Sequence, residues 1–576
     1  MMNKELKTRA GISKITLSNF QVFADKTEIP IDKITLLFGP NSAGKSAIED
    51  ALDIVSFIKG SEIMQGSRAV SEAFSTTGFA GRSIVGGMSR ENSEFLKKIL
   101  SCWRKSSHPA KYEQSMSIEI EENLSLDDGE GLYILANQKS TQAQKISETF
   151  VFYIQDEDFD GTLDQPDDIK ILYILSIDQV CLLSFTEGYE SASINCQHKS
   201  ISPLDFSSYF NHEMDIGSVD EIHASKDFDV NLKSNIIASF DNEIINFDGV
   251  FGFTLRGHSE IQGIRKSMMG SRLVQLAKNK QEYENAFVIF STIFQEILES
   301  VWKWRNEALS LQTVIVNASR KIPTTNDLFI YTKHSLESKF LVESQLHGFT
   351  HHPCFFDGKK INSPISSKNN YIHYLHDADI HSRVNYFLSN QMFSEKGYFI
   401  GKDVEYIPYN NVDPVKNVEL RLTFTQFFLA DPDATRFSFE EVGSGLGYVF
   451  PILCVCSQSA RNLVIIQQPE LHLHPALQAS LGDVFIESAE SKTLIVESHS
   501  EHLLLRILKR IRQSHLQANI AAELKINADD VCVLYFDPSP DGTTTVKRLR
   551  ITEDGEFMDR WPRGFFGERD QELLDE

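Results

Sequence analysis

The sequence lacks any uninterrupted apolar run long enough to cross a bilayer, which takes about 18 to 20 residues, and has no apolar secretory segment near its first residue. Both absences count against membrane insertion and export. Cysteine is scarce, and the 7 residues show neither the spacing of a zinc site nor that of a disulfide framework. They lie at Cys102, Cys181, Cys196, Cys354, Cys454, Cys456 and Cys532. We therefore expect a soluble, cytoplasmic protein with reduced thiols.

Positive charge is also in deficit, since 56 Lys and Arg stand against 80 Asp and Glu, for a formal net charge of -24. This balance counts against binding nucleic acid over the whole surface, although a local basic groove stays open. Internal repeats and low-complexity tracts are missing too, which excludes repeat arrays. A length of 576 residues allows about two to four domains.

A glycine-rich loop near the start of the chain carries the strongest motif. It reads Gly39-Pro40-Asn41-Ser42-Ala43-Gly44-Lys45-Ser46 and fits the phosphate-loop pattern G-x-x-x-x-G-K-[ST]. In this pattern backbone N–H groups surround phosphate oxygens, the lysine neutralises charge, and the serine hydroxyl binds Mg²⁺. The apolar run at 34–38 predicts a buried strand before the loop, and residues 46–55 predict a helix after it. The expected phosphate-binding residues are Gly39, Asn41, Ser42, Ala43, Gly44, Lys45, Ser46 and Ala47.

The rest of the chain alternates between sheet-like and helical patterns. We expect a strand within 12–23, mostly helix at 47–105 with a glycine-rich break at 78–87, an antiparallel sheet region at 116–253, a helical stretch at 271–309, and a mixture at 310–440 with one helix at 381–391. The C-terminal part predicts strands at 462–466, 492–497 and 530–536 and helices at 475–487 and 502–513. A phosphate loop first and this alternation last predict one α/β core interrupted by a large insertion.

Three motifs in the C-terminal part can complete a nucleotide site. The glycine-rich segment Glu441 to Gly447 precedes the apolar stretch 448–456; it can offer N–H groups and a serine hydroxyl to a phosphate, or be only a flexible loop before a core helix. The apolar strand before Gln467 ends in polar residues and a proline, in the order of a Walker B segment. The next strand ends in Glu497-Ser498-His499-Ser500, which places an imidazole where a terminal phosphate can be sensed.

Together these motifs resemble a known family. The order of Asn19-Phe20, the phosphate loop, Gly443 to Gly447, Gln467 to Pro475 and Glu497 to Leu508 is similar to that of the ABC-type, SMC-like P-loop ATPases, in particular the AAA15-like ATPases of bacteria. A shorter echo lies at 318–323. The closing runs at 551–557 and 561–566 resemble the tail of a subgroup that includes the PtuA ATPases of Septu and retron antiphage systems. The resemblance covers roughly the first 60 and the last 160 residues.

The resemblance implies an ATPase head with a mixed sheet, flanking helices and an antiparallel β subdomain. It implies a head-to-tail dimer or higher oligomer that holds ATP and Mg²⁺, in which Ser444 and Gly445 of one protomer contact in trans the γ-phosphate bound to the other, and His499 is the switch histidine. The expected domains are an N-terminal part of the head at 1–115, an antiparallel β-rich region at 116–265, an inserted helical subdomain at 266–400, and a C-terminal part of the head at 401–576.

The end of the Walker B-like strand departs from the family pattern, which has an acidic residue followed by Glu. Gln467 takes the place of the residue that organises Mg²⁺, and Gln468 that of the general base. An amide cannot accept the proton of the attacking water, and general-base help is typically worth ~10²- to 10⁴-fold. We therefore expect slow hydrolysis. The nearest carboxylate, Glu470, can substitute only if its loop curls back. The expected site residues are Lys45, Gln468, His499 and Glu470 for catalysis and Ser46 and Gln467 for Mg²⁺.

Other candidate sites have weaker patterns. Asp529-Asp530 and Asp537 can mimic an acidic nuclease cluster, but the pair is better interpreted as a turn before a strand. His472 and His474 suggest zinc, yet no third ligand lies near them in the sequence. Basic residues gather at Arg265, Lys266, Arg272, Lys278 and Lys280, and on one predicted helix face at Arg506, Lys509, Arg510 and Arg512. Each set is either a solvated face or a track for DNA, RNA or an acidic partner.

Two functions stay open. The first, implied by the resemblance, is an ATP-binding subunit of an antiphage defence system that assembles with a separate HNH nuclease, with or without a reverse transcriptase and its RNA and DNA product. The second is an SMC-like ATPase that acts directly on DNA in repair or end processing. The middle of the chain is neither long enough nor heptad-patterned enough for the coiled-coil arm of DNA-repair relatives, which favours the first.

Overall fold

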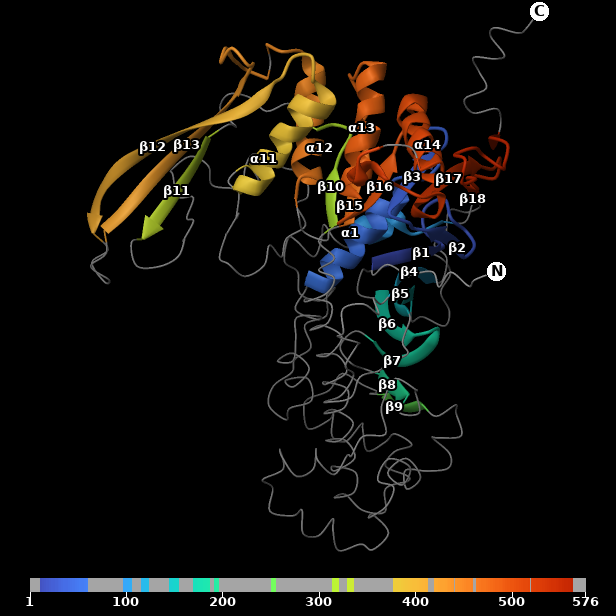
Figure 1. The fold of residues 1–576 in the computed structure, drawn as a ribbon. Helices are drawn as coiled ribbons and strands as arrows, with labels where there is room; N and C mark the ends of the chain where they lie inside the picture. The colour runs from blue at the N-terminus through green and yellow to red at the C-terminus, as the bar shows by residue number, and fades with distance from the viewer. Residues whose placement is uncertain are drawn as a thin grey trace, which may run out of the picture. The chain divides into compact units, whose positions relative to one another are not determined.

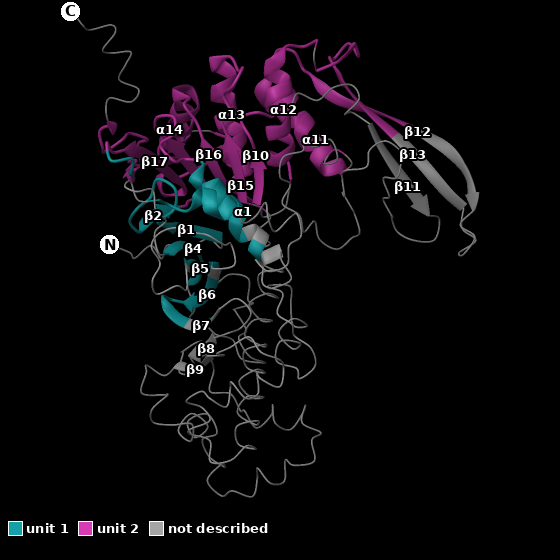
Figure 2. Cartoon of the chain, turned by 180° about the vertical axis from the view of Figure 1, so that it is seen from behind, with its two compact units in different colours: residues 1–30, 46–310, 541–543 teal, residues 31–45, 311–540, 544–576 magenta. Residues whose placement is uncertain are grey.

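The structure is a computed structural model that describes most of the two ends of the chain and parts of its middle. The described residues are 11–60, 97–105, 115–123, 145–154, 169–186, 191–195, 250–254, 313–320, 329–335, 375, 377–412, 419–439, 441–458, 463–517 and 520–562. They divide between two compact units (Figure 2): unit 1 comprises residues 1–30, 46–310 and 541–543, and unit 2 comprises residues 31–45, 311–540 and 544–576. The predicted α/β class is confirmed, because parallel strands with helices between them occur together with an antiparallel sheet.

Unit 1 contains an antiparallel sheet whose strand order is β2-β1-β4-β5-β6-β7-β8-β9. The strands are β1 (Gly11–Ser18), β2 (Thr27–Pro30), β4 (Ser115–Asn123), β5 (Lys145–Ile154), β6 (Ile169–Ile177), β7 (Val180–Thr186), β8 (Ser191–Asn195) and β9 (Val250–Thr254). Alternate residues of β4 and β5, such as Ile118, Ile120, Phe150 and Phe152, are buried, which is the period-two pattern of a half-buried strand. The antiparallel region predicted at 116–253 is therefore confirmed for the described strands.

The first strand is shorter than the interval within which it was expected. It ends at Ser18, because Asn19 (φ 50°) and Gln21 (φ 48°) adopt left-handed backbone conformations that an extended strand does not allow. Helix α1 (Ala47–Gly60) confirms the helix predicted after the phosphate loop. Lys98, in a second helical stretch at 97–102, pairs with Asp50 and Asp53 of α1. The glycine-rich break predicted at 78–87 lies outside the described residues.

Unit 2 is built on a second sheet with strand order β10-β15-β16-β3-β17-β18. Its strands are β3 (Ile34–Phe38), β10 (Thr313–Val316), β15 (Leu463–Gln467), β16 (Thr493–Glu497), β17 (Val531–Pro538) and β18 (Thr544–Leu549). All neighbours pair in parallel except β17 and β18. All five residues of β3 are buried, as expected for an apolar run between two parallel neighbours. A strand from the start of the chain thus lies between β16 and β17, strands from its end.

The helices in the described residues of unit 2 are α11 (Ala378–Tyr386), α12 (Ser444–Cys456), α13 (Pro475–Ser488) and α14 (Glu501–His515), of which the last three are drawn in orange beside the sheet in Figure 1. A π-helical turn, η5 (Phe387–Met392), continues α11, and the 3₁₀ turns η6 (Ala522–Leu524) and η7 (Ala528–Asp530) precede β17. The strand and helix alternation predicted after residue 462 is confirmed, as is the helix predicted at 381–391. The helical stretch predicted at 271–309 lies outside the described residues.

Three features of unit 2 were not expected from the sequence. Strand β10 joins the edge of the core sheet, and β18 extends its other edge. A separate sheet in the order β11-β13-β12 contains β11 (Phe329–Ser335), β12 (Phe399–Val412) and β13 (Glu419–Ala430), with the short β14 (Arg436–Phe437) paired to β13. Helix α12 begins at Ser444, four residues before the predicted apolar stretch.

No helix in the described part of the chain is both long and apolar enough to cross a membrane.

Candidate nucleotide-binding site

The carboxyl ends of β3, β15 and β16 lie side by side at the same end of the unit 2 sheet, because these neighbouring strands run parallel. Gln467 at the end of β15 is the register partner of Glu497 at the end of β16, and Glu497 is in turn the partner of Leu37 on β3. The phosphate loop leaves β3 at Gly39, one residue beyond its last strand residue. Glu497 therefore stands between the Walker B-like strand and the strand that leads into the loop. Such carboxyl ends are where open α/β sheets bind ligands.

The phosphate loop begins with a glycine that no other residue can replace without movement. Gly39 has φ 142°, and a Cβ atom added there would lie 2.6 Å from the carbonyl oxygen of Phe536 on β17. Ser42 and Gly44 follow with φ values of 63° and 88°. These left-handed residues turn the backbone of the loop within a few residues. The sequence therefore places glycine where the loop backbone leaves no room beside β17 for a Cβ atom.

Lys45 is buried, with 5% of its surface exposed. Its Nζ donates hydrogen bonds to the carbonyl oxygens of Gly39 (3.0 Å) and Pro40 (2.9 Å) and lies 3.6 Å from Oε1 of Glu497. Burial lowers the pKa of the Lys45 ammonium, while the Glu497 carboxylate opposes that shift. A cation enclosed by its own loop at the end of a parallel strand fits the phosphate group of a nucleotide, since phosphate oxygens can replace the carboxylate as its anionic partner.

The two glutamines at the end of β15 have different contacts. Oε1 of Gln467 accepts a hydrogen bond from the backbone N–H of Ala318 at 3.1 Å, at the end of β10. The backbone N–H of Gln468, a residue with φ 42°, donates to the carbonyl oxygen of Glu497 at 2.7 Å. The side chain of Gln467 therefore holds the segment that follows β10. The backbone of Gln468 holds the loop after β15 to the end of β16.

The loop after β15 does curl back, as a substitution by Glu470 would require. Glu470 accepts hydrogen bonds from Oγ of Ser498 (2.9 Å) and from the backbone N–H of His499 (2.7 Å). Both carboxylate oxygens are thus engaged at the tip of β16, beside the residue expected to act as the switch histidine. In this arrangement Glu470 positions the segment that carries His499.

The glycine-rich segment Glu441 to Gly447 contains the N-cap and the first turn of α12. Ser444 is the first helical residue and is exposed, and its N-cap Gly443 (φ 87°) has no side chain to cap the helix. A Cβ atom on Gly445 would lie 2.9 Å from the carbonyl oxygen of His472, so this turn packs directly on the loop after β15. An uncapped helix start with an exposed hydroxyl has the chemistry to receive a phosphate.

Arg320 is a site residue to which the sequence patterns assign no role. It is 2% exposed, and its guanidinium donates to the carbonyl oxygens of Tyr448 (2.6 Å), Gln467 (3.0 Å) and Gln468 (3.1 Å), with further bonds to Asn317 and Pro469. One buried cation therefore ties the start of α12 to the end of β15. The only sequence signal for it is its position in the run 318–323, which resembles the family.

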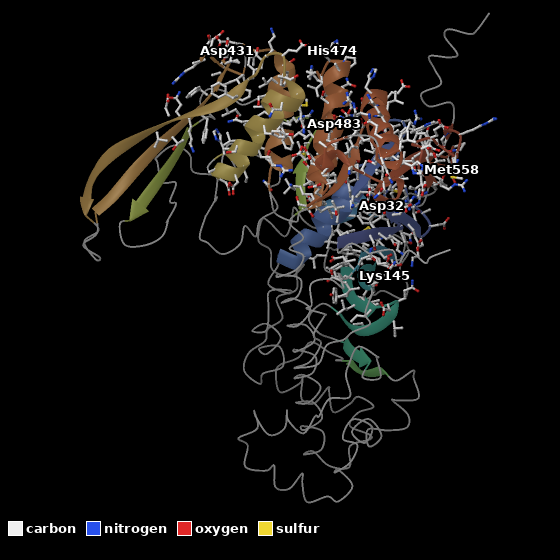
Figure 3. The ribbon with its side chains drawn as sticks, in the orientation of Figure 1. Asp32, Lys145, Asp431, His474, Asp483 and Met558 are labelled. Atoms are coloured by element: carbon white, nitrogen blue, oxygen red, sulfur yellow. The ribbon has the colours of Figure 1, made fainter. Side chains whose placement is uncertain are left out.

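The two histidines that suggested zinc have structural contacts. Nδ1 of His474 accepts a hydrogen bond from the N–H of Ala476 and caps α13, near the label in Figure 3. The ring of His472 stacks on Tyr448, with 4.4 Å between the ring centroids. Among the residues that the structure describes, no group of three or more His, Cys, Asp or Glu is arranged to hold a metal ion.

The predicted basic face of α14 is wrong in part. Arg506 and Arg510 are half-buried and both pair with Asp483 of α13, the residue labelled in Figure 3, at N–O distances of 2.8 and 2.7 Å. Arg512 binds the carbonyl oxygen of Asp554 and the carboxylate of Glu556. Arg506 and Arg510 share one face of α14, as the helical spacing predicts, but α13 packs there and supplies their acid, whereas Arg512 contacts the segment at 554–556. The other basic cluster, at 265–280, lies outside the described residues.

The carboxylates that could mimic a nuclease cluster also have partners. The turn predicted at Asp529-Asp530 is confirmed as η7, in which Asp530 accepts from the backbone N–H of Asn527 at 3.1 Å. Asp530 also pairs with Lys33 at 2.7 Å, and Asp537 pairs with Lys547 at 2.7 Å. These contacts give Asp530 a structural role in the turn η7 and Asp537 a structural role in the β17–β18 hairpin.

Comparison with known proteins places the chain among nucleotide-binding ATPases. The AAA_15 model, described as an AAA ATPase domain, matches residues 11–504, and a second model, described as a protein of unknown function (DUF3696), matches residues 526–575. No curated protein matches the chain.

Solved structures similar to the chain include SMC head domains. That of Pyrococcus furiosus, with an extended coiled coil and the C-terminal domain of ScpA, has 11% identity and a TM-score of 0.34 over 98% of this chain and 99% of that one. The head domain of Thermotoga maritima has 8% identity and a TM-score of 0.33 over 94% of this chain and 99% of that one. At these scores the family assignment rests on the AAA_15 match, which spans most of the chain.

Proposed function

Because the chain belongs to the AAA_15 family of AAA ATPase domains, we propose that it binds ATP with Mg²⁺ at the phosphate loop and hydrolyses it slowly. The observation that carries this proposal is the buried ammonium of Lys45, which is enclosed by the carbonyls of its own loop and by Glu497 at the carboxyl ends of β3 and β16. Slow hydrolysis follows from the amide of Gln468 where a general base belongs. ATP then acts mainly as a ligand that holds an assembly.

Mg²⁺ would accompany the nucleotide phosphates, since it is commonly bound through few protein groups plus phosphate oxygens. The hydroxyl of Ser46, which follows Lys45 in the motif, and the oxygens at the ends of β15 and β16 are the groups of this chain suited to it. When bound, Mg²⁺ neutralises charge on the phosphates. His499, held through its backbone by Glu470, is the residue placed to sense the terminal phosphate.

We further propose that ATP lies between two protomers arranged head to tail. The exposed Ser444 and the uncapped first turn of α12 support this proposal, because they present a hydroxyl and helix N–H groups outward from the chain. Ser444 and Gly445 of one protomer would then contact the γ-phosphate held by Lys45 of the other. The ATP-bound form would be a dimer or a higher oligomer.

The role of this assembly, in our proposal, is to regulate a separate nuclease of the HNH type in antiphage defence. The resemblance of the runs at 551–557 and 561–566 to PtuA ATPases supports it. The longest described helix, α14, has 15 residues, so the described part of the chain contains no coiled-coil arm. A reverse transcriptase and its nucleic-acid product belong to the same proposal as further partners.

Direct action on DNA is the second candidate, and one observation weighs against it. Arg506 and Arg510, which would form a basic track on α14, are already paired with Asp483. A track of phosphate-binding residues needs cations that are available to the backbone of DNA. The paired arginines leave less positive charge for that purpose than the sequence indicates.

A binding and mass experiment tests the proposal. We expect the purified chain to bind a fluorescent ATP analogue, and Lys45→Ala to abolish that binding. Light scattering with a non-hydrolysable ATP analogue should show a doubled mass for the wild type and a monomer mass for Ser444→Arg. Ser394→Arg, at another exposed serine of unit 2, is the control and should still dimerise. A wild type that binds ATP with unchanged mass would refute the dimer.

The neighbouring genes test the defence role. A gene for an HNH nuclease beside this one, and an increase in mass when its product is added with ATP, are the expected results. A purified nuclease from that position that neither binds the ATP-loaded chain nor changes its activity with it would exclude the regulatory role.

A further inference from the structure

A nucleotide site that binds Mg²⁺ needs negative charge near the phosphates, because this cation prefers carboxylate oxygens among side chains. The end of β15 supplies only amides, Gln467 and Gln468. The amide oxygen of Gln467 is, moreover, turned toward β10, where it accepts the N–H of Ala318 at 3.1 Å. The carboxylate of Glu470 is engaged by Ser498 and His499. Both residues thus already accept hydrogen bonds from other parts of the protein.

Glu497 is a carboxylate that lies close to the phosphate loop. It ends β16, the strand between β15 and β3, and is the register partner of Gln467 on one side and of Leu37 on the other. Neighbouring strands lie about 4.8 Å apart, so its carboxylate starts one strand away from each. Its side chain is 16% exposed, and its Oε1 lies 3.6 Å from Nζ of Lys45. This carboxylate therefore already contacts the group expected to bind phosphate.

We propose that Glu497 is the acidic residue of the nucleotide site. In the structure it is the anionic partner of Lys45. With nucleotide bound, phosphate oxygens would take over as partners of Lys45, and the Glu497 carboxylate would be available to hold the accompanying Mg²⁺. The buried ammonium thus exchanges one anion for another and is never left without one. This assignment deepens the proposed function and rests on it.

The assignment predicts two opposite effects of Glu497→Gln on nucleotide binding. In the wild type, Mg²⁺ should raise the affinity for ATP. In Glu497→Gln the affinity measured with Mg²⁺ should be about 10- to 100-fold lower than in the wild type, which is the usual effect of removing a group that organises a metal. The second effect is an equal or higher affinity in EDTA, because Lys45 no longer has a competing carboxylate. Titration of a fluorescent ATP analogue with Mg²⁺ and with EDTA measures both effects. Electron paramagnetic resonance of Mn²⁺ with the non-hydrolysable complex measures cation binding without any turnover.

A charge exchange between the two strands sharpens the test. Because Gln467 and Glu497 are register partners, the double variant Gln467→Glu with Glu497→Gln moves the carboxylate by one strand, and we expect it to recover most of the metal dependence. Glu490→Gln is the matched control, since Glu490 is exposed beyond the far end of α13, about 20 Å along the helix from its start. Its metal dependence should equal that of the wild type.

Three results have distinct meanings. A Glu497→Gln chain that keeps the full gain from Mg²⁺, with a thermal unfolding midpoint close to that of the wild type, overturns the assignment. An equal loss of affinity with Mg²⁺ and with EDTA also overturns it, because Glu497 would then only position Lys45. A wild-type chain that binds no ATP at all would overturn the proposed function itself, and this assignment with it.

Discussion

The guanidinium of Arg320 donates through Nε to the backbone carbonyl of Tyr448 at 2.6 Å. Tyr448 belongs to the second turn of α12, whose first residue is Ser444, and the same guanidinium donates to the carbonyls of Gln467 and Gln468. The two segments proposed to contact different nucleotides of one dimer are thus tied together within each protomer.

Replacing Arg320 should destabilise the chain strongly. Arg320→Ala removes five hydrogen bonds of a guanidinium that is 2% exposed, and a hydrogen bond from a charged group is worth about 1.5–3 kcal/mol, so we expect a loss of about 3 kcal/mol or more. Thermal and urea unfolding measure it. Arg550→Ala removes an exposed arginine that pairs with Asp559 and should change the unfolding midpoint little. Similar shifts of the unfolding midpoint in the two variants would mean that the buried hydrogen bonds of Arg320 stabilise the chain no more than an exposed ion pair does.

Restoring a base at the end of β15 should accelerate hydrolysis. In Gln468→Glu the backbone N–H can still donate to the carbonyl of Glu497, and the new carboxylate can accept the proton of an attacking water. We expect ATP turnover to rise by about 10²- to 10⁴-fold, measured as phosphate release at saturating ATP. Gln468→Asn, which keeps an amide, is the control. Turnover of roughly tens per second in the wild type would show instead that the chain needs no carboxylate there.

Space, rather than backbone strain alone, should make Gly39 irreplaceable. Gly39→Ala brings a Cβ atom to 2.6 Å from the carbonyl of Phe536, whereas Gly542, also at positive φ (78°), has nothing within 4 Å of the same atom. We expect Gly542→Ala to cost only the strain of about 1–2 kcal/mol. Gly39→Ala should in addition displace the loop and lower ATP affinity by at least tenfold, an order-of-magnitude expectation for a misplaced binding loop. Equal ATP affinity in both variants would contradict this explanation.

The central strands of the core sheet could be predicted from the sequence because they have a strong local signal, whereas the outer strands β10 and β18 could not. Apolar runs such as those at 34–38 and 493–496 are typical of strands buried on both faces, and each is followed by a helical pattern. The start of α12 could not be predicted, because Gly445 and Gly447 in its first turn disfavour a helix locally. Burial of Leu446 and Val449 against the core supplies the stability that the local sequence lacks.

The candidate site was predictable only where its residues are consecutive. The phosphate loop is one segment, so its residues could be named from the motif. Arg320 could not be assigned a role, because an isolated arginine is usually exposed and four of its five carbonyl partners come from segments more than a hundred residues away. The relationship of Glu497 to Gln467 and Lys45 depends on strand order, which a local pattern does not contain.

Lys492 should give the stability of the chain a distinct pH dependence. It is 1% exposed and donates to the carbonyl oxygens of Cys456 and Gln458, and burial lowers its pKa from 10.5 to about 8. That lowered pKa already includes a smaller lowering by Arg383 and an opposing effect of the Cys456 thiolate. The unfolded chain therefore binds more protons than the folded chain between about pH 8 and 10.5, so the Lys492 contribution becomes more favourable as pH rises through that window.

Lys492→Met removes this proton-linked term and leaves any pH-independent loss constant. Between pH 7.5 and 9.5 the free energy of unfolding of the wild type should rise by about 2 kcal/mol relative to the variant, as the two pKa values require. Urea unfolding at several pH values measures the difference. Lys396→Met, at an exposed lysine, provides the control and should follow the wild type. A constant difference between the wild type and Lys492→Met across this range would mean that Lys492 keeps the same proton in the folded and unfolded chains.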